Sequence, residues 1–206
     1  MEERRKDINK KIGMYSSAVN VLAVAGFALS MLLGKSYASY FICMFIAFSF
    51  VPMIAAYCFY SSESRKTAGL TAMLFAAAYM VIILVVYFAQ LTAVADGGLN
   101  DQALGIIDFQ SMGLFFSYDL LGYGLMALAT FFAGLTMEST TKSDKWLKRL
   151  LLIHGIFFIS CLLIPMSGVF QKDMPGGDFA GVAVLEFWCI YFIPVGVLSY
   201  LHFRRK

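Results

Sequence analysis

The sequence predicts an all-α membrane protein in which six transmembrane helices form one bundle. Hydrophobic residues make up 60% of the 206 residues and charged residues only 14%, whereas a soluble domain carries about 25% charged residues. Apolar runs of about 20 residues recur along the chain, long enough for a helix to cross a bilayer core. Lysine and arginine gather at alternate connections between these runs. The composition excludes a soluble enzyme, a disordered chain, a coiled coil and a nucleic-acid-binding module.

Six apolar stretches have the length that a membrane-crossing helix needs at a rise of about 1.5 Å per residue. Helices are predicted rather than strands, because the stretches lack the alternating pattern of a membrane barrel. The first stretch has no clear cleavage site and is predicted to be retained. Together the stretches form a single domain over residues 1–206. Their predicted bounds are Met14–Leu33, Tyr37–Tyr60, Ala68–Thr92, Ser111–Thr136, Leu147–Val169 and Phe179–Phe203.

The distribution of basic residues predicts the orientation of the helices. Fourteen lysine and arginine side chains fall on one side and two, Lys35 and Lys172, on the other. Cytoplasmic loops of membrane proteins carry the excess of basic residues, so both termini are predicted to be cytoplasmic. The fourteen are Arg4, Arg5, Lys6, Lys10, Lys11, Arg65, Lys66, Lys142, Lys145, Lys148, Arg149, Arg204, Arg205 and Lys206.

Aspartates are prominent in the loops that this orientation places outside. Their negative charge either reflects only the shortage of lysine and arginine there or forms a vestibule that concentrates cations. The longest connection, Ala93–Gln110, has a turn at Gly97 and Gly98 followed by apolar residues, which predicts a short interfacial or re-entrant segment. Its aspartates lack the spacing of a calcium-binding loop, so no metal site is predicted. The outer aspartates are Asp96, Asp101, Asp108, Asp173 and Asp178.

Two carboxylates lie within the predicted helices, Asp119 in the fourth and Glu186 in the sixth. Both are about 10–12 Å from the outer boundary at 1.5 Å per residue, and a charge near the bilayer centre costs at least ~2.5–3.5 kcal/mol. Their equal depth predicts one outward-facing site for a small cation or a proton, which Tyr123 and Gln90 would complete. The alternative is a buried hydrogen-bonded pair that only orients two helices.

His154 lies seven residues into the fifth stretch and is predicted to be either a packing residue or a proton-relay station. The four cysteines occur within apolar stretches and are predicted to pack as small hydrophobes. No pattern typical of a metalloprotease, a serine hydrolase, a P-loop or a Rossmann fold occurs. The sequence therefore predicts no catalytic residue and no cofactor, and its two histidines are too few for a multi-haem cytochrome.

The segment 119–136, DLLGYGLMALATFFAGLT, and the segment 146–156, WLKRLLLIHGI, carry a resemblance. They resemble small uncharacterised six-helix proteins of the bacterial inner membrane, which form a domain family of unknown function. The resemblance covers about the last half of the chain. It implies a bacterial inner-membrane location and brings no activity.

These observations predict functions of different classes. The first is an integral membrane protein that binds or transports a small cationic solute, an ion or a proton at the two intramembrane carboxylates. The second is a non-catalytic accessory or assembly subunit that binds another membrane protein. A lipid-modifying intramembrane enzyme is a third alternative. Convergence of Asp119 and Glu186 on one cavity favours the first function, and separate helix contacts favour the second.

Overall fold

The computed structural model describes residues 2–168 and 177–206, with side chains described from 7 and from 181 onward. Within these residues the chain is helical and contains no strand. The helices are α1 (Glu2–Leu32), α2 (Ser36–Phe59), η1 (Glu63–Arg65), α3 (Lys66–Ala89), η2 (Gln90–Val94), α4 (Asp101–Ile107), η3 (Phe109–Ser111), α5 (Leu114–Thr136), α6 (Lys142–His154), α7 (Phe157–Met166) and α8 (Gly177–Arg204).

Six segments of the described chain are long and apolar enough to cross a membrane, which confirms the number of predicted spans and their approximate positions. Large apolar side chains face outward from them, such as Leu22 at 73% and Leu74 at 72% exposure. The predicted end at Val169 and the loop charges Lys172 and Asp173 lie outside the described residues. The spans are Asp7–Leu32, Ser36–Phe59, Glu63–Val94, Leu114–Thr136, Lys142–Met166 and Gly181–Arg204.

The fifth span is not the continuous helix that the sequence predicts, because α6 and α7 are separated by a break at Gly155 and Ile156. Both amides donate three residues back, Gly155 to Leu152 at 3.2 Å and Ile156 to Ile153 at 3.0 Å, which tightens the turn. A Cβ atom at Gly155 would lie only 2.9 Å from the Cβ atom of Phe131. Glycine therefore lets the break pack closely against α5.

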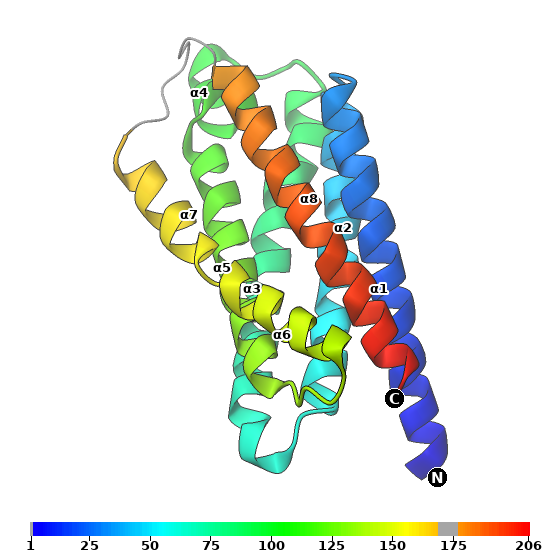
Figure 1. The fold of residues 1–206 in the computed structure, drawn as a ribbon. Helices are drawn as coiled ribbons and strands as arrows, with labels where there is room; N and C mark the ends of the chain where they lie inside the picture. The colour runs from blue at the N-terminus through cyan, green and yellow to red at the C-terminus, as the bar shows by residue number, and fades with distance from the viewer. Residues whose placement is uncertain (1, 169–176) are drawn as a thin grey trace.

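The spans pack side by side in a ring (Figure 1). α8 packs along α1, α1 along α2, α2 along α3, α3 along α5, and α5 along α6 and α7; a contact between α6 and α8 closes the ring. Both termini lie at one end of the bundle, here called the basic end, and α4 lies at the other, here called the acidic end. The acidic end carries Asp96, Asp101 and Asp108. Which end faces the cytoplasm stays a prediction.

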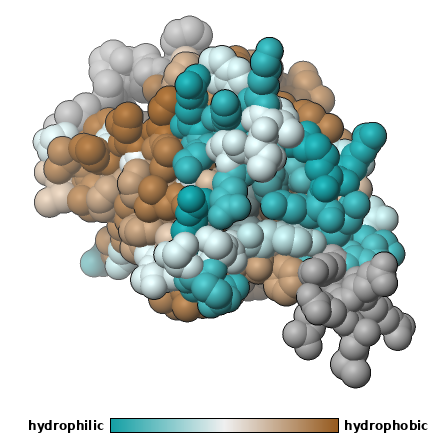
Figure 2. Space-filling model, turned by 60° about the horizontal axis from the view of Figure 1, so that its bottom comes forward, coloured by the Kyte–Doolittle hydropathy of each residue, from teal (hydrophilic) through white to brown (hydrophobic). Residues whose placement is uncertain are grey.

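Hydrophilic side chains gather over the basic end, beside an apolar flank of the bundle (Figure 2). Ion pairs occur here, between the exposed Lys11 and Asp7 at 2.7 Å and between the half-buried Arg65 and the exposed Glu138 at 3.7 Å. Such pairs contribute about 0–1 kcal/mol each, because solvent screens them. The polar cover therefore marks this end of the bundle without adding much to its stability.

Aromatic rings fill the centre of the bundle. Phe50 of α2 packs on Tyr79 of α3 with ring centroids 5.3 Å apart, and Tyr79 packs on Tyr123 of α5 at 5.9 Å. Tyr123 in turn packs on Trp188 of α8 at 5.2 Å. In lipid, this close van der Waals packing rather than the exclusion of water holds helices together. The chain of rings also fixes the turn of α5 that carries Asp119.

Candidate functional site

Asp119 is a carboxylate in the interior of the bundle. It lies in the second turn of α5, and only 2% of its surface is exposed. Its Oδ1 atom has no hydrogen-bond partner, and no ion pair of Asp119 occurs within the described residues. An ionised carboxylate in hydrocarbon is costly without a compensating charge. The position is therefore suited to a group that takes up a proton or another cation.

Tyrosine hydroxyls and a thiol surround this carboxylate. The hydroxyl of Tyr87 of α3 interacts with Asp119 and with Cys43 of α2. The hydroxyl of Tyr123, which the sequence places one turn beyond Asp119, is instead 3.0 Å from the Cys43 Sγ atom. The hydroxyl of Tyr79 is buried and has no hydrogen-bond partner in the described part of the chain. These five residues, here called the Asp119 cluster, bring three spans together around polar atoms that are not all satisfied.

Gln90 lies next to the cluster, but its side-chain amide forms hydrogen bonds with backbone groups of the acidic end. It begins the π-helical turn η2, where 3% of its surface is exposed. Its Nε2 donates to the Ile107 carbonyl at 2.8 Å, and its Oε1 accepts from the Phe109 amide at 2.9 Å. The amide thus holds α4 and η3 against α3, and the Phe109 ring packs on Tyr87 at 6.1 Å. The segment 101–111 forms a cover over the Asp119 cluster.

Replacing Gln90 with alanine is expected to loosen this cover. The Phe109 amide and the Ile107 carbonyl would lose their partners, at a cost of about 1–3 kcal/mol in the local opening free energy. Hydrogen exchange of peptides within 101–111 should therefore become faster, while exchange in α1 stays unchanged. Gln102→Ala is the control, because that amide is exposed on the same segment. Equal exchange in both variants would show that Gln90 does not hold the cover.

Glu186 does not join the Asp119 cluster. Its side chain on α8 is half-buried, and its Oε1 has no hydrogen-bond partner among the residues that the structure describes. No hydrogen bond joins Glu186 to Asp119 within the described part of the chain. The reason is helix packing, since α8 lies mainly against α1 and α6 rather than against α5. Equal depth along two helices does not bring their side chains together.

His154 ends α6 in a fully connected chain of hydrogen bonds. The Trp188 indole Nε1 donates to His154 Nε2 at 3.1 Å, and His154 Nδ1 lies 2.7 Å from the Thr130 hydroxyl. That hydroxyl donates to the Ala127 carbonyl at 2.8 Å. Nε2 must therefore accept and Nδ1 must carry the proton, which defines a single neutral tautomer. Both ring nitrogens are occupied in a side chain that is 1% exposed.

A second buried carboxylate, Asp144, lies at the basic end and is not among the candidate residues that the sequence singles out. Its Oδ1 accepts from His202 Nδ1 at 2.8 Å and from Arg205 at 2.7 Å. Its Oδ2 accepts from the Thr141 hydroxyl at 2.7 Å, and the Asp144 amide donates back to that hydroxyl at 3.1 Å. These four residues are here called the Asp144 cluster. The cluster caps α6 and ties it to the end of α8.

Two signals could have identified these residues in the sequence. Thr141 and Asp144 have the spacing of a capping box, which places Asp144 in a first helical turn. Tyr87 lies three residues before Gln90, on the same stretch of α3. No pattern in the sequence shows that His202 reaches Asp144 or that Tyr87 reaches Asp119, because both contacts join residues distant along the chain.

The side chains described here offer no ready metal site. No group of three or more His, Cys, Asp or Glu side chains that could hold a metal ion occurs within the described residues. Comparison of the chain with protein-family models, with curated proteins and with solved structures finds no match. Among the described residues, the Asp119 cluster is the arrangement that points to a function.

Proposed function

We propose that the protein binds and releases a proton at Asp119 and couples this exchange to the handling of a small cationic solute in the membrane. The observation that carries the proposal is a carboxylate 2% exposed, with an unpartnered oxygen and no ion pair in the described chain. Ionisable groups at such positions are costly and are typical of proton and ion pathways. A proton needs no cavity, whereas a larger cation requires the surrounding rings to move.

The acidic end offers a route to this carboxylate. Tyr40 of α2 is half-buried, and its hydroxyl accepts from the exposed Gln110 amide at 3.1 Å. Its ring lies 5.5 Å from that of Tyr87, whose hydroxyl interacts with Asp119. Hydroxyl groups both donate and accept, so they can pass a proton. Tyr40 and Tyr87 thus lie between the surface at Gln110 and the buried carboxylate, and we propose that a proton passes along their hydroxyls.

Proton flux into liposomes tests the proposal. The purified protein is reconstituted with a pH-sensitive dye inside, and a potassium diffusion potential drives proton uptake. Wild-type protein is expected to acidify the lumen faster than empty liposomes, and Asp119→Asn to abolish the difference, because asparagine cannot exchange a proton. Tyr87→Phe is expected to slow uptake. Asp96→Asn, which alters an exposed carboxylate of the acidic end, is expected to leave it unchanged.

Infrared difference spectra between low and high pH test the proton-binding step separately from flux. A carboxylic-acid carbonyl band that is present in wild type and in Asp96→Asn should be missing in Asp119→Asn. Loss of flux in Glu186→Gln as well would restore the two-carboxylate site that the sequence predicts. Absence of both flux and the band would contradict the proposal and favour an accessory subunit.

A further inference from the structure

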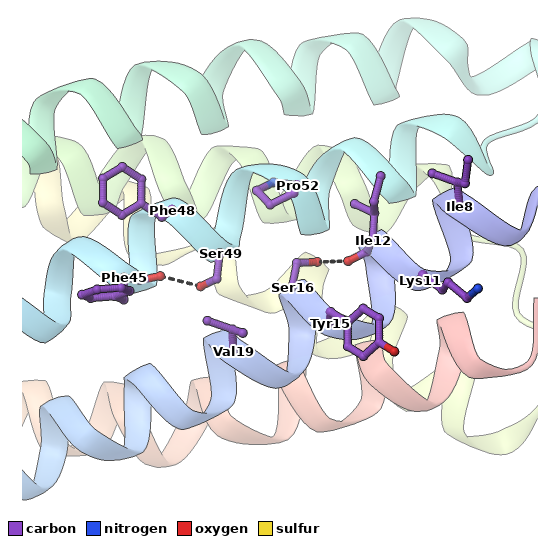
Figure 3. Close-up of a pocket in the computed structure, with 10 residues that line it drawn as sticks. All are labelled: Ile8, Lys11, Ile12, Tyr15, Ser16, Val19, Phe45, Phe48, Ser49 and Pro52. Atoms are coloured by element: carbon purple, nitrogen blue, oxygen red, sulfur yellow. Dashed lines mark hydrogen bonds between the residues drawn. The ribbon is translucent and has the colours of Figure 1, made fainter. Parts of the chain in front are cut away.

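A groove of about 470 Å³ opens on the flank of the bundle between α1 and α2, near the basic end. Its walls are almost entirely apolar (Figure 3), with Ile12 and Val19 contributed by α1 and Phe45 and Phe48 by α2. Lys11 lies toward one end of it. None of the residues that line the groove belongs to the Asp119 cluster, and the groove plays no part in the proton exchange proposed above.

The serine hydroxyls along the groove form hydrogen bonds with backbone carbonyls of their own helices. The Ser16 hydroxyl donates to the Ile12 carbonyl at 2.6 Å, and the Ser49 hydroxyl donates to the Phe45 carbonyl at 2.7 Å. Asn20 joins the two helices, since its Nδ2 donates to Ser49 Oγ at 3.0 Å. The hydroxyls are therefore satisfied inside the protein, and what the groove offers to an occupant is apolar surface.

The length of the groove matches one leaflet of a bilayer. Its α1 wall runs from Ile8 to Val19, which is about 16 Å along a helix axis and about half of a 30 Å hydrocarbon core. Lys11 lies toward the end of this wall that is nearer the chain terminus, and Tyr15, near its middle, is 65% exposed. Exposed tyrosines and lysines are typical of the membrane–water interface.

The charge at this end favours an anion. Among the described side chains Lys11 pairs with Asp7, and both are more than half exposed, so the pair is weak and can exchange for a phosphate. Lys10 directly precedes Lys11 and lies at nearly the same depth. Basic residues near a membrane surface attract anionic lipid headgroups. A partner helix fits less well, because a helix 10–12 Å wide and 16 Å long occupies roughly 1,200 Å³ or more.

We propose that this groove binds an acyl chain of an anionic phospholipid whose phosphate is bound by Lys11. Photo-crosslinking tests the proposal, with the full chain in phosphatidylcholine liposomes that contain a trace of phosphatidylglycerol carrying a diazirine on its acyl chain. Crosslinks are expected in residues 8–19 and 45–52. Unlabelled phosphatidylglycerol should compete with the probe better than unlabelled phosphatidylcholine does.

Matched variants separate the groove from the general lipid-facing surface. Val19→Trp fills the groove and should reduce crosslinking there, whereas Leu22→Trp adds the same ring to a more exposed position outside it. Lys11→Gln should weaken the preference for phosphatidylglycerol about fivefold, and Lys10→Gln should weaken it less. Crosslinks spread evenly over all spans, equal effects of the two tryptophan variants, or crosslinks to a second protein chain would overturn the proposal. Circular dichroism confirms that each variant is folded.

Discussion

Replacing Asp144 with alanine is expected to lower the free energy of unfolding by about 3–5 kcal/mol. The carboxylate is 2% exposed and is shared by His202, Arg205 and Thr141. Its removal leaves the Arg205 guanidinium and the His202 ring without their acceptor, and the capping box of α6 is lost at the same time. The substitution therefore breaks several interactions at once.

The expected consequence is separation of α6 from the end of α8. These helices close the ring of spans, and His202 also stacks on Tyr57 of α2 with ring centroids 5.8 Å apart. The Tyr57 hydroxyl donates to Ser199 at 2.7 Å. Loss of Asp144 should therefore weaken the packing of α2 and α8 as well as that of α6.

Unfolding in mixed micelles, followed by circular dichroism, measures the effect. Asp7→Ala is the matched control, because Asp7 pairs with Lys11 at the same end of the bundle but is 54% exposed, so about 0–1 kcal/mol is expected. Asp144→Asn should fall between wild type and alanine, since an amide oxygen still accepts from Thr141. Equal stability of Asp144→Ala and Asp7→Ala would show that the cluster contributes no more than a surface pair.

The sequence alone could predict the number and positions of the spans, because each span satisfies its own backbone hydrogen bonds and must be about 20 apolar residues long. That constraint is local and acts on every residue in a window. The break at Gly155 falls outside it, since a glycine within an apolar run has no fixed meaning until Phe131 of α5 packs against it. The same apolar composition is compatible with one continuous helix or with two helices separated by a break, so composition does not predict the break.

The candidate site could be predicted only in part, because its geometry depends on rotation and tilt of neighbouring helices. Depth along the helix axis correctly draws attention to Asp119 as a residue within a span, but depth does not determine which helices touch. Tyr87 takes the place beside Asp119 that the sequence offers to Glu186 and Tyr123. Gln90 has the expected depth too, yet its amide is committed to the backbone of 107 and 109.

Replacing His154 with alanine is expected to lower the free energy of unfolding by about 3 kcal/mol or more, because it opens a cavity and leaves a buried indole N–H without an acceptor. The ring packs between Phe192, with centroids 5.1 Å apart, and Tyr191, at 5.7 Å. His154→Gln should recover part of the loss, since its amide can accept from Trp188 and donate to Thr130. The same unfolding assay compares the two variants.

Measurements on His154 distinguish a structural role of this residue from a role as a proton relay. The hydrogen bonds from Trp188 and to Thr130 require the proton on Nδ1, so the ¹⁵N spectrum of labelled histidine should show that tautomer. The chain has only two histidines, which makes His202 the internal reference. A relay must gain and lose a proton during turnover, so it requires the His154 signals to change with pH and His154→Gln to abolish flux. If the signals stay constant and His154→Gln retains flux, the proton path ends at the Asp119 cluster and does not run through the Trp188–His154–Thr130 chain, which then serves only to hold α5, α6 and α8 together.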